Sequence, residues 1–132
     1  MIVAVDSSVI FSILKGEPAG EKWLNLLIEH AAVGLLKISE IVAAEVAAHF
    51  DSKRSFLSTL QQLNLEYEAI NLESCYLAGQ IFRQYREEGG KREFLIPDFL
   101  IAAHATQQAQ ALLAQDRGYL RRYFPKLKVL SI

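Results

Sequence analysis

The feature that most constrains this chain is a short apolar run at its start, residues 2–5, which ends at a carboxylate, Asp6. Four apolar residues in succession, without the alternation of a half-exposed strand, are typical of a strand buried on both faces. Such strands belong to parallel sheets whose two faces are covered by helices. Ser7 and Ser8 follow Asp6 and are good helix-starting residues. The run therefore predicts an α/β domain.

The same alternation continues along the chain. Further strands are predicted at residues 34–38, 65–70 (an edge strand), 111–114 and 128–131. Helices are predicted at residues 9–14, 20–32, 40–50, 52–63, 72–88, 97–110 and 117–124. Ser39 and Asn71 are suited to cap two of the helices, and Pro97 to begin a third. The order predicts a three-layer α/β/α fold with a mostly parallel central sheet of about four or five strands.

The helix over residues 72–88 is expected to be amphipathic. The spacing of its side chains groups five residues on one face, namely Leu72, Cys75, Tyr76, Gly79 and Phe82.

The amino-acid composition limits the classes of protein to which this chain can belong. The chain has 132 residues, 52% of them apolar, so we expect one domain over 1–132 with a substantial core. Lys and Arg (14) nearly balance Asp and Glu (15), which removes overall basicity as an argument for nucleic-acid binding but allows a local basic patch. A single cysteine, no membrane-spanning run and no signal-peptide pattern predict a soluble, cytoplasmic protein.

Four carboxylates lie where a carboxylate is expensive. Asp6 and Asp116 each follow a predicted buried strand, and the carboxyl ends of parallel strands form the ligand crevice of such sheets. Asp98 lies in the first turn of a predicted helix, and Glu45 is the only charge in an apolar, alanine-rich one. Asp51, the remaining aspartate, lies in a polar junction and is interpreted as a capping residue.

Each acid also has a purely structural interpretation. Asp6, Asp98 and Asp116 could cap or begin helices, and Glu45 could pair with His49 or point to solvent. Taken together, several carboxylates in one crevice would repel one another strongly unless they share protons or hold a divalent cation. Oxygen ligands favour Mg²⁺ or Mn²⁺. The three histidines lie in separate predicted helices, which argues against zinc.

Four segments resemble the PIN-domain ribonucleases, and among these the VapC-type toxins of toxin–antitoxin operons. The segments are residues 2–10 (IVAVDSSVI), 38–46 (ISEIVAAEV), 95–105 (LIPDFLIAAHA) and 112–129 (LLAQDRGYLRRYFPKLKV). Their order and the chain length match the family over nearly the whole sequence.

The resemblance implies a Mg²⁺- or Mn²⁺-dependent endoribonuclease. Its catalytic and metal-binding acids would be Asp6, Glu45, Asp98 and Asp116, with Asp6 and Asp98 as the main metal ligands. The sequence departs from the family pattern at two positions. Ala114 stands where many members carry Thr or Ser, which removes a hydroxyl beside the last acid, and Ser8 stands where Asn is common.

A nuclease must also attract a polyanion to this acidic cleft. The candidate RNA-binding residues are Lys91, Arg92, Arg117, Arg121 and Arg122. Tyr119 or Tyr123 could stack a base, although core packing is the commoner role at such spacings. The resemblance also implies a small antitoxin partner and a homodimer. Apolar residues before Gly34 or around Phe56 and Leu60 could serve either contact, or the core.

Other acid-bearing α/β enzymes fit less well. A haloacid-dehalogenase-type phosphatase needs a second Asp where Ser8 stands, and a response-regulator receiver needs an acidic pair and a late lysine. The alternative to the nuclease is a catalytically weak or silent PIN-like module that binds a protein partner or RNA.

Overall fold

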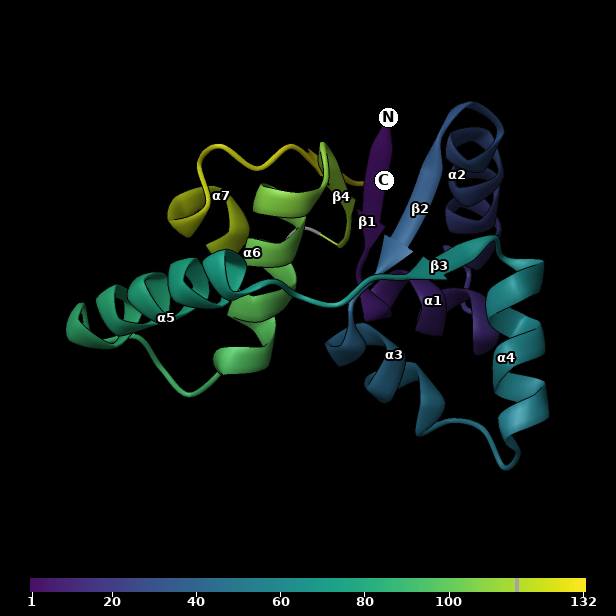
Figure 1. The fold of residues 1–132 in the computed structure, drawn as a ribbon, viewed down its shortest axis with the longest axis horizontal. Coiled ribbons are helices and arrows are strands. Elements are labelled where there is room, and N and C mark those ends of the chain that lie inside the picture. The colour runs from purple at the N-terminus through teal and green to yellow at the C-terminus, as the bar shows by residue number, and fades with distance from the viewer. Residues whose placement is uncertain (116) are drawn as a thin grey trace.

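A five-stranded sheet in which all paired strands run parallel organises the chain, in the order β3-β2-β1-β4-β5 (Figure 1). The computed structural model describes residues 1–115 and 117–132. The strands are β1 (Ile2–Val5), β2 (Leu35–Ile38), β3 (Leu65–Tyr67), β4 (Ala111–Leu113) and β5 (Val129–Leu130). The predicted parallel α/β architecture is therefore confirmed.

Burial along the strands follows their place in the sheet. The central strand β1 pairs with β2 and β4, so that Val3 lies between Leu36 and Ala111. All three of these residues are buried. The edge strand β3 buries only Leu65 and exposes Glu66 and Tyr67. The alternation of its sequence therefore does not correspond to one continuous buried face.

Helices flank the sheet in two groups, with α5, α6 and α7 on one side of Figure 1 and α1 to α4 on the other. Their bounds are α1 (Ser7–Leu14), α2 (Gly20–Val33), α3 (Glu40–Ala47), α4 (Lys53–Gln62), α5 (Leu72–Glu87), α6 (Ile96–Gln108) and α7 (Tyr119–Tyr123). Within the residues that the structure describes, none of these helices is long and apolar enough to cross a membrane.

The local signals for helix starts are mostly confirmed. The Ser39 hydroxyl accepts from the backbone N–H of Val42, and the Asn71 side chain accepts from that of Ser74. The interpretation of Asp51 as a cap is wrong. Ser52 caps α4 instead, by accepting from the Ser55 N–H at 3.1 Å.

The face predicted for α5 does not coincide with the face that this helix buries. Ser74, Ala78 and Tyr85 are buried, whereas Leu72 is 86% exposed and Tyr76 70% exposed. The reason is the close packing of α5 against α6, because small side chains at the contact let two helices approach. A pattern that ranks residues by hydrophobicity assigns Leu and Tyr to the interior before Ser and Ala.

A polar cluster around the buried His104 ties the segment after β3 to α6. The Nε2 atom of His104, which is 2% exposed, lies 2.9 Å from the Glu68 carboxylate. The Gln108 side chain donates to the carbonyl of Ala69 at 3.1 Å and accepts from the N–H of Asn71 at 3.0 Å. These bonds fix the connection between β3 and α5, which has no regular structure of its own.

Candidate functional site: an acidic cluster at the carboxyl end of the sheet

Asp6 lies directly after β1 and caps α1. Its Oδ2 accepts from the backbone N–H of Ser8 at 3.3 Å and from the Ser8 hydroxyl at 2.5 Å. The Asp6 N–H donates to the carbonyl of Leu113 at 2.9 Å, so β4 also fixes its backbone. The capping interpretation is therefore correct. It also explains how the carboxylate is held at the carboxyl ends of the two central strands.

Asp98 lies in the first turn of α6 and uses its two oxygens differently. Oδ2 accepts from the N–H of Leu95 at 2.9 Å, which caps the helix. Oδ1 accepts from Nη2 of Arg117 at 3.2 Å. Only one oxygen of this carboxylate thus serves the helix, and the other forms an ion pair with a distant part of the chain.

Glu45 projects from α3 beside the buried residues Val42 and Val46 and is itself largely exposed. Its pKa is raised, mainly by partial desolvation of the carboxylate and further by the negative charges of Asp6 and Asp98. A hydrogen bond from Ser7 and the positive charge of Arg117 act in the opposite direction on this pKa. Asp6 and Asp98 therefore both lie within electrostatic reach of Glu45.

The alternative partner for Glu45 is occupied elsewhere. The ring of His49 packs against that of Phe11, with their centroids 4.5 Å apart. The buried Ser7, rather than His49, makes a side-chain hydrogen bond with Glu45. Nothing in the sequence singled out Ser7 as a neighbour of Glu45, because the contact joins α1 to α3 through the fold.

Arg117 is held by an aromatic pair as well as by Asp98. Its guanidinium carbon lies 5.2 Å from the ring centroid of Phe94 and 5.4 Å from that of Tyr119. These two rings stack on each other at 4.1 Å, and both are buried. Gly118 separates Arg117 from α7 with a φ of 87°, a left-handed conformation that favours glycine. No sequence pattern had indicated that Phe94 contacts Arg117.

Tyr119 packs in the core, as the commoner interpretation of its spacing predicted. It is 8% exposed, and burial raises its pKa, with further contributions from Asp98 and Asp6. Its hydroxyl therefore stays protonated beside the carboxylates.

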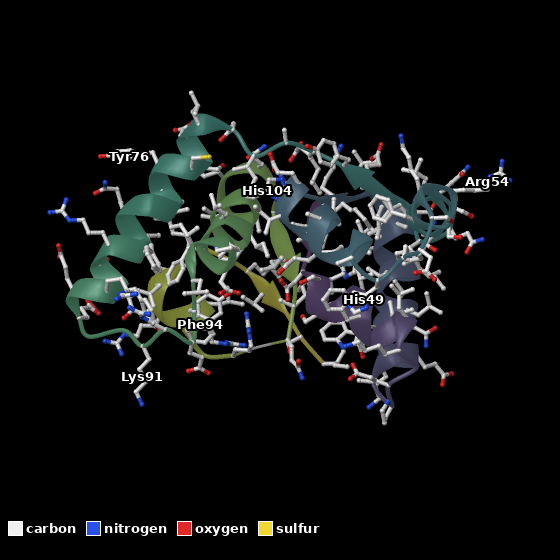
Figure 2. The ribbon with its side chains drawn as sticks, turned by 90° about the horizontal axis from the view of Figure 1, so that it is seen from below. His49, Arg54, Tyr76, Lys91, Phe94 and His104 are labelled. Carbon is white, nitrogen blue, oxygen red and sulfur yellow. The ribbon has the colours of Figure 1, made fainter. Side chains whose placement is uncertain are left out.

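The other basic candidates lie apart from this ion pair. Lys91 and Arg92 are exposed in the segment between α5 and α6, where the Lys91 side chain points outward (Figure 2). Arg121 is exposed on α7. Arg122 pairs with Glu88 at 3.3 Å and lies over the ring of Tyr123. Of the five predicted RNA-binding residues, Arg117 is the one with a described contact to a site carboxylate.

Asp116, the fourth predicted acid, lies outside the described residues. Among the residues that are described, no three His, Cys, Asp or Glu side chains lie close enough together to hold a metal ion. The donor chemistry nevertheless suits a hard divalent cation. The charges of Asp6 and Asp98 raise the pKa of Glu45, and all three groups offer oxygen. Ala114, two residues before Asp116, is buried and offers no hydroxyl.

Comparison with known families identifies one match. The model of the PIN domain matches residues 3–125. No curated protein sequence matches the chain.

Solved structures with the same fold include chains of VapBC toxin–antitoxin complexes. One chain of VapBC2 from Rickettsia felis, bound to a DNA fragment from its promoter, aligns with a TM-score of 0.73 and 23% identity, over 100% of this chain and 99% of that one. One chain of VapBC-1 from nontypeable Haemophilus influenzae aligns with a TM-score of 0.73 and 18% identity, over 99% and 98%. A chain of FitAcB from Neisseria gonorrhoeae aligns with a TM-score of 0.64 and 21% identity, over 98% and 96%.

Proposed function

The chain belongs to the PIN-domain family, and from that premise we propose that it is a Mg²⁺- or Mn²⁺-dependent endoribonuclease, the toxin of a toxin–antitoxin pair. In this proposal residues 1–132 form one catalytic domain that acts in the cytoplasm. The observation that carries the proposal is the convergence of Asp6, Glu45 and Asp98, from β1, α3 and α6, at the carboxyl end of the sheet.

The proposed site assigns different tasks to the acids. Asp6 and Asp98 hold the divalent ion, with Glu45 and Asp116 completing the acidic site. When bound, the ion supplies Lewis-acid activation of water and neutralises charge on the scissile phosphate. Glu45 is suited to accept the proton of the attacking water, because its raised pKa makes it a stronger base than an ordinary carboxylate.

RNA needs positive charge near these acids. Arg117 supplies it from within the site, and Lys91, Arg92, Arg121 and Arg122 are proposed to contact the backbone further along the strand. A net charge of −1 leaves such local contacts as the main electrostatic attraction.

The test is cleavage of a structured RNA by the purified chain, with and without Mg²⁺ or Mn²⁺. Cleavage that requires the ion and disappears in Asp6→Asn and Asp98→Asn supports the proposal. Asp51→Asn is the matched control, because it removes the same charge from an exposed junction between α3 and α4. If the folded parent binds RNA without cleaving it under any ion, the chain is a silent binding module and the nuclease proposal is wrong.

The proposed antitoxin partner has a suitable surface away from the acids. A hollow of about 560 Å³ lies between α2, α4 and the sheet edge, with Leu35, Leu57 and Leu60 among its lining residues. Leu57 is 50% exposed, and neighbouring Val33 on α2 is 77% exposed. We propose that an apolar antitoxin segment covers this hollow. The toxin–antitoxin complexes named above support such a partner.

Co-expression with the protein encoded beside this chain tests the partner. Leu57→Asp should abolish co-purification while leaving the isolated chain folded, because Leu57 is half exposed. Retained co-purification would place the antitoxin elsewhere.

A homodimer is also proposed, and the exposed face of α5 is its candidate contact. This face presents exposed side chains with apolar surface, namely Leu72, Cys75 and Tyr76. Light scattering of the parent and of Tyr76→Glu tests this assignment: the parent should be a dimer and the variant a monomer. A dimeric variant would contradict it.

A further inference from the structure

The position of Arg117 suggests that the acidic site carries its own counter-cation. Asp98 has two carboxylate oxygens, and the N–H of Leu95 occupies Oδ2 in the cap of α6. The Arg117 guanidinium donates to the other oxygen, Oδ1, at 3.2 Å. A divalent ion that takes Asp98 as a ligand would therefore meet the positive charge of Arg117 at the same carboxylate and compete with it.

The guanidinium is not a loose surface group that happens to rest on the nearest acid. It lies over the stacked rings of Phe94 and Tyr119, which are buried, and half of the Arg117 side chain remains exposed. Aromatic faces hold a guanidinium without consuming its N–H donors. Arg117 also makes a side-chain hydrogen bond with Tyr119. These contacts can hold its stem in place while the donor that pairs with Asp98 turns to another anion.

The charges in the cluster favour a cation at this point. Asp6, Glu45 and Asp98 contribute three carboxylates against the single positive charge of Arg117 among the described groups that act on Glu45. The positive charge of Arg117 lowers the pKa of Glu45, whereas the negative charges of Asp6 and Asp98 raise it. The guanidinium therefore acts on Glu45 as well as on its bonded partner Asp98.

We propose that Arg117 is a positioning residue that occupies the Asp98 oxygen until a divalent ion displaces it, and that the displaced guanidinium then binds an RNA phosphate. The inference rests on the proposed function and deepens it. It couples the two ligands of the site: ion binding frees Arg117, and a phosphate that holds Arg117 away from Asp98 strengthens ion binding. By thermodynamic reciprocity each ligand raises the affinity for the other by the same factor.

The first test is a titration of the purified chain with Mn²⁺, in which the paramagnetic signal of the free ion measures binding. Arg117→Gln removes the competitor, so its affinity for Mn²⁺ should rise by about fivefold to tenfold. Arg117→Lys keeps the charge and should stay within about twofold of the parent. Arg54→Gln is the matched control, because it removes the same charge from an exposed position at the far edge of the molecule (Figure 2). Circular dichroism checks that every variant is folded.

The second part of the proposal is that the displaced Arg117 binds an RNA phosphate. Binding of a short RNA oligonucleotide, with Ca²⁺ in place of the catalytic ion, tests it. The ion should strengthen RNA binding by the parent by about tenfold, and Arg117→Gln should lose most of that gain. An Mn²⁺ affinity of Arg117→Gln equal to or below that of the parent overturns the inference while the proposed function stands. If the parent binds no Mn²⁺ at all, the proposed function fails first, and the inference fails with it.

Discussion

Helix α6 presents two carboxylate partnerships that are built in opposite ways. Near its start, Asp98 pairs with Arg117 at 3.2 Å, and the side chain of Arg117 is 45% exposed. Further along the same helix, His104 contacts Glu68 at 2.9 Å, and the side chain of His104 is 2% exposed. Both partnerships join α6 to a segment that is distant in the sequence, and their carboxylates are similarly exposed, 26% for Asp98 and 30% for Glu68. The difference lies in the other partner, so we call the pair with the buried His104 the closed pair and the pair with the exposed Arg117 the open pair.

The surroundings of the two pairs explain the difference. Around His104 and Glu68, the side chain of Gln108 bonds to Glu68, Ala69 and Asn71, so that the polar groups satisfy one another. Around Asp98, two further carboxylates raise the local negative charge beyond what Arg117 neutralises. A balanced cluster holds a structure together. An unbalanced one can be neutralised by protons or by a cation from outside, and this imbalance is the physical argument for a site.

The largest expected effect is on the open pair. Asp98→Asn should reduce the rate of RNA cleavage by about 1000-fold, because it removes a negative charge that would hold the catalytic ion. The free energy of unfolding should change by less than about 1 kcal/mol, since the asparagine oxygen can still accept from the Leu95 N–H. Cleavage kinetics and urea unfolding of the same preparation measure both. A rate within tenfold of the parent would remove Asp98 from the proposed site.

The closed pair should show the reverse behaviour. His104→Ala should lower the free energy of unfolding by about 3 kcal/mol, because it leaves a cavity and deprives Glu68 of its partner. The cleavage rate per folded molecule should fall by less than about threefold, since the contact holds the chain rather than the substrate. Urea unfolding gives the first value and activity well below the transition midpoint the second. A large loss of activity in fully folded protein would show that the two pairs are coupled through α6.

A smaller effect is expected at the edge of the closed cluster. Gln108→Ala removes the hydrogen bonds to Ala69 and Asn71, together with one from the Ser74 hydroxyl at 2.9 Å. Because this side chain is partly exposed and water can replace some of these bonds, the loss should be about 1 to 1.5 kcal/mol of unfolding free energy. Gln108→Glu is a useful companion, since it keeps an acceptor for Asn71 but places a negative charge beside Glu68. It should be less stable than Gln108→Ala, and equal stability would mean that Glu68 does not sense the charge.

Most of the fold could be predicted from the sequence, because the patterns that indicate strands and helix starts are local. Short apolar runs such as residues 2–5 and 111–114 are typical of buried strands, and caps such as Ser39 and Asn71 act within one helical turn. The face of α5 is a different case. Which side of that helix is buried depends on how closely α6 approaches, and Leu72 and Tyr76 are exposed for a reason that periodicity does not contain.

The places of Asp6 and Asp98 in the fold could be predicted from the sequence, but the contacts of the acids could not. Asp6 and Asp98 follow a strand and begin a helix, so their positions could be located from the sequence. Their contacts depend on the tertiary fold: Ser7 reaches Glu45 from α1, and Phe94 lies under Arg117 from the segment before α6. No spacing rule joins these residues. The assignment of all four acids as ligands remains a prediction.

The smallest effect tests how finely the open site is positioned. The Ser8 hydroxyl donates to Oδ2 of Asp6, and the Ser8 backbone N–H contacts the same oxygen. In Ser8→Ala the backbone bond remains and water can reach the partly exposed carboxylate, so the cleavage rate should fall by only about twofold. Ser8→Asn restores a side-chain donor and should return the rate to the parent value. A loss of more than tenfold in Ser8→Ala, with Ser8→Asn equally inactive, would mean that the hydroxyl contacts the substrate itself. The open pair on α6 would then be only one part of a site whose other half surrounds Ser8.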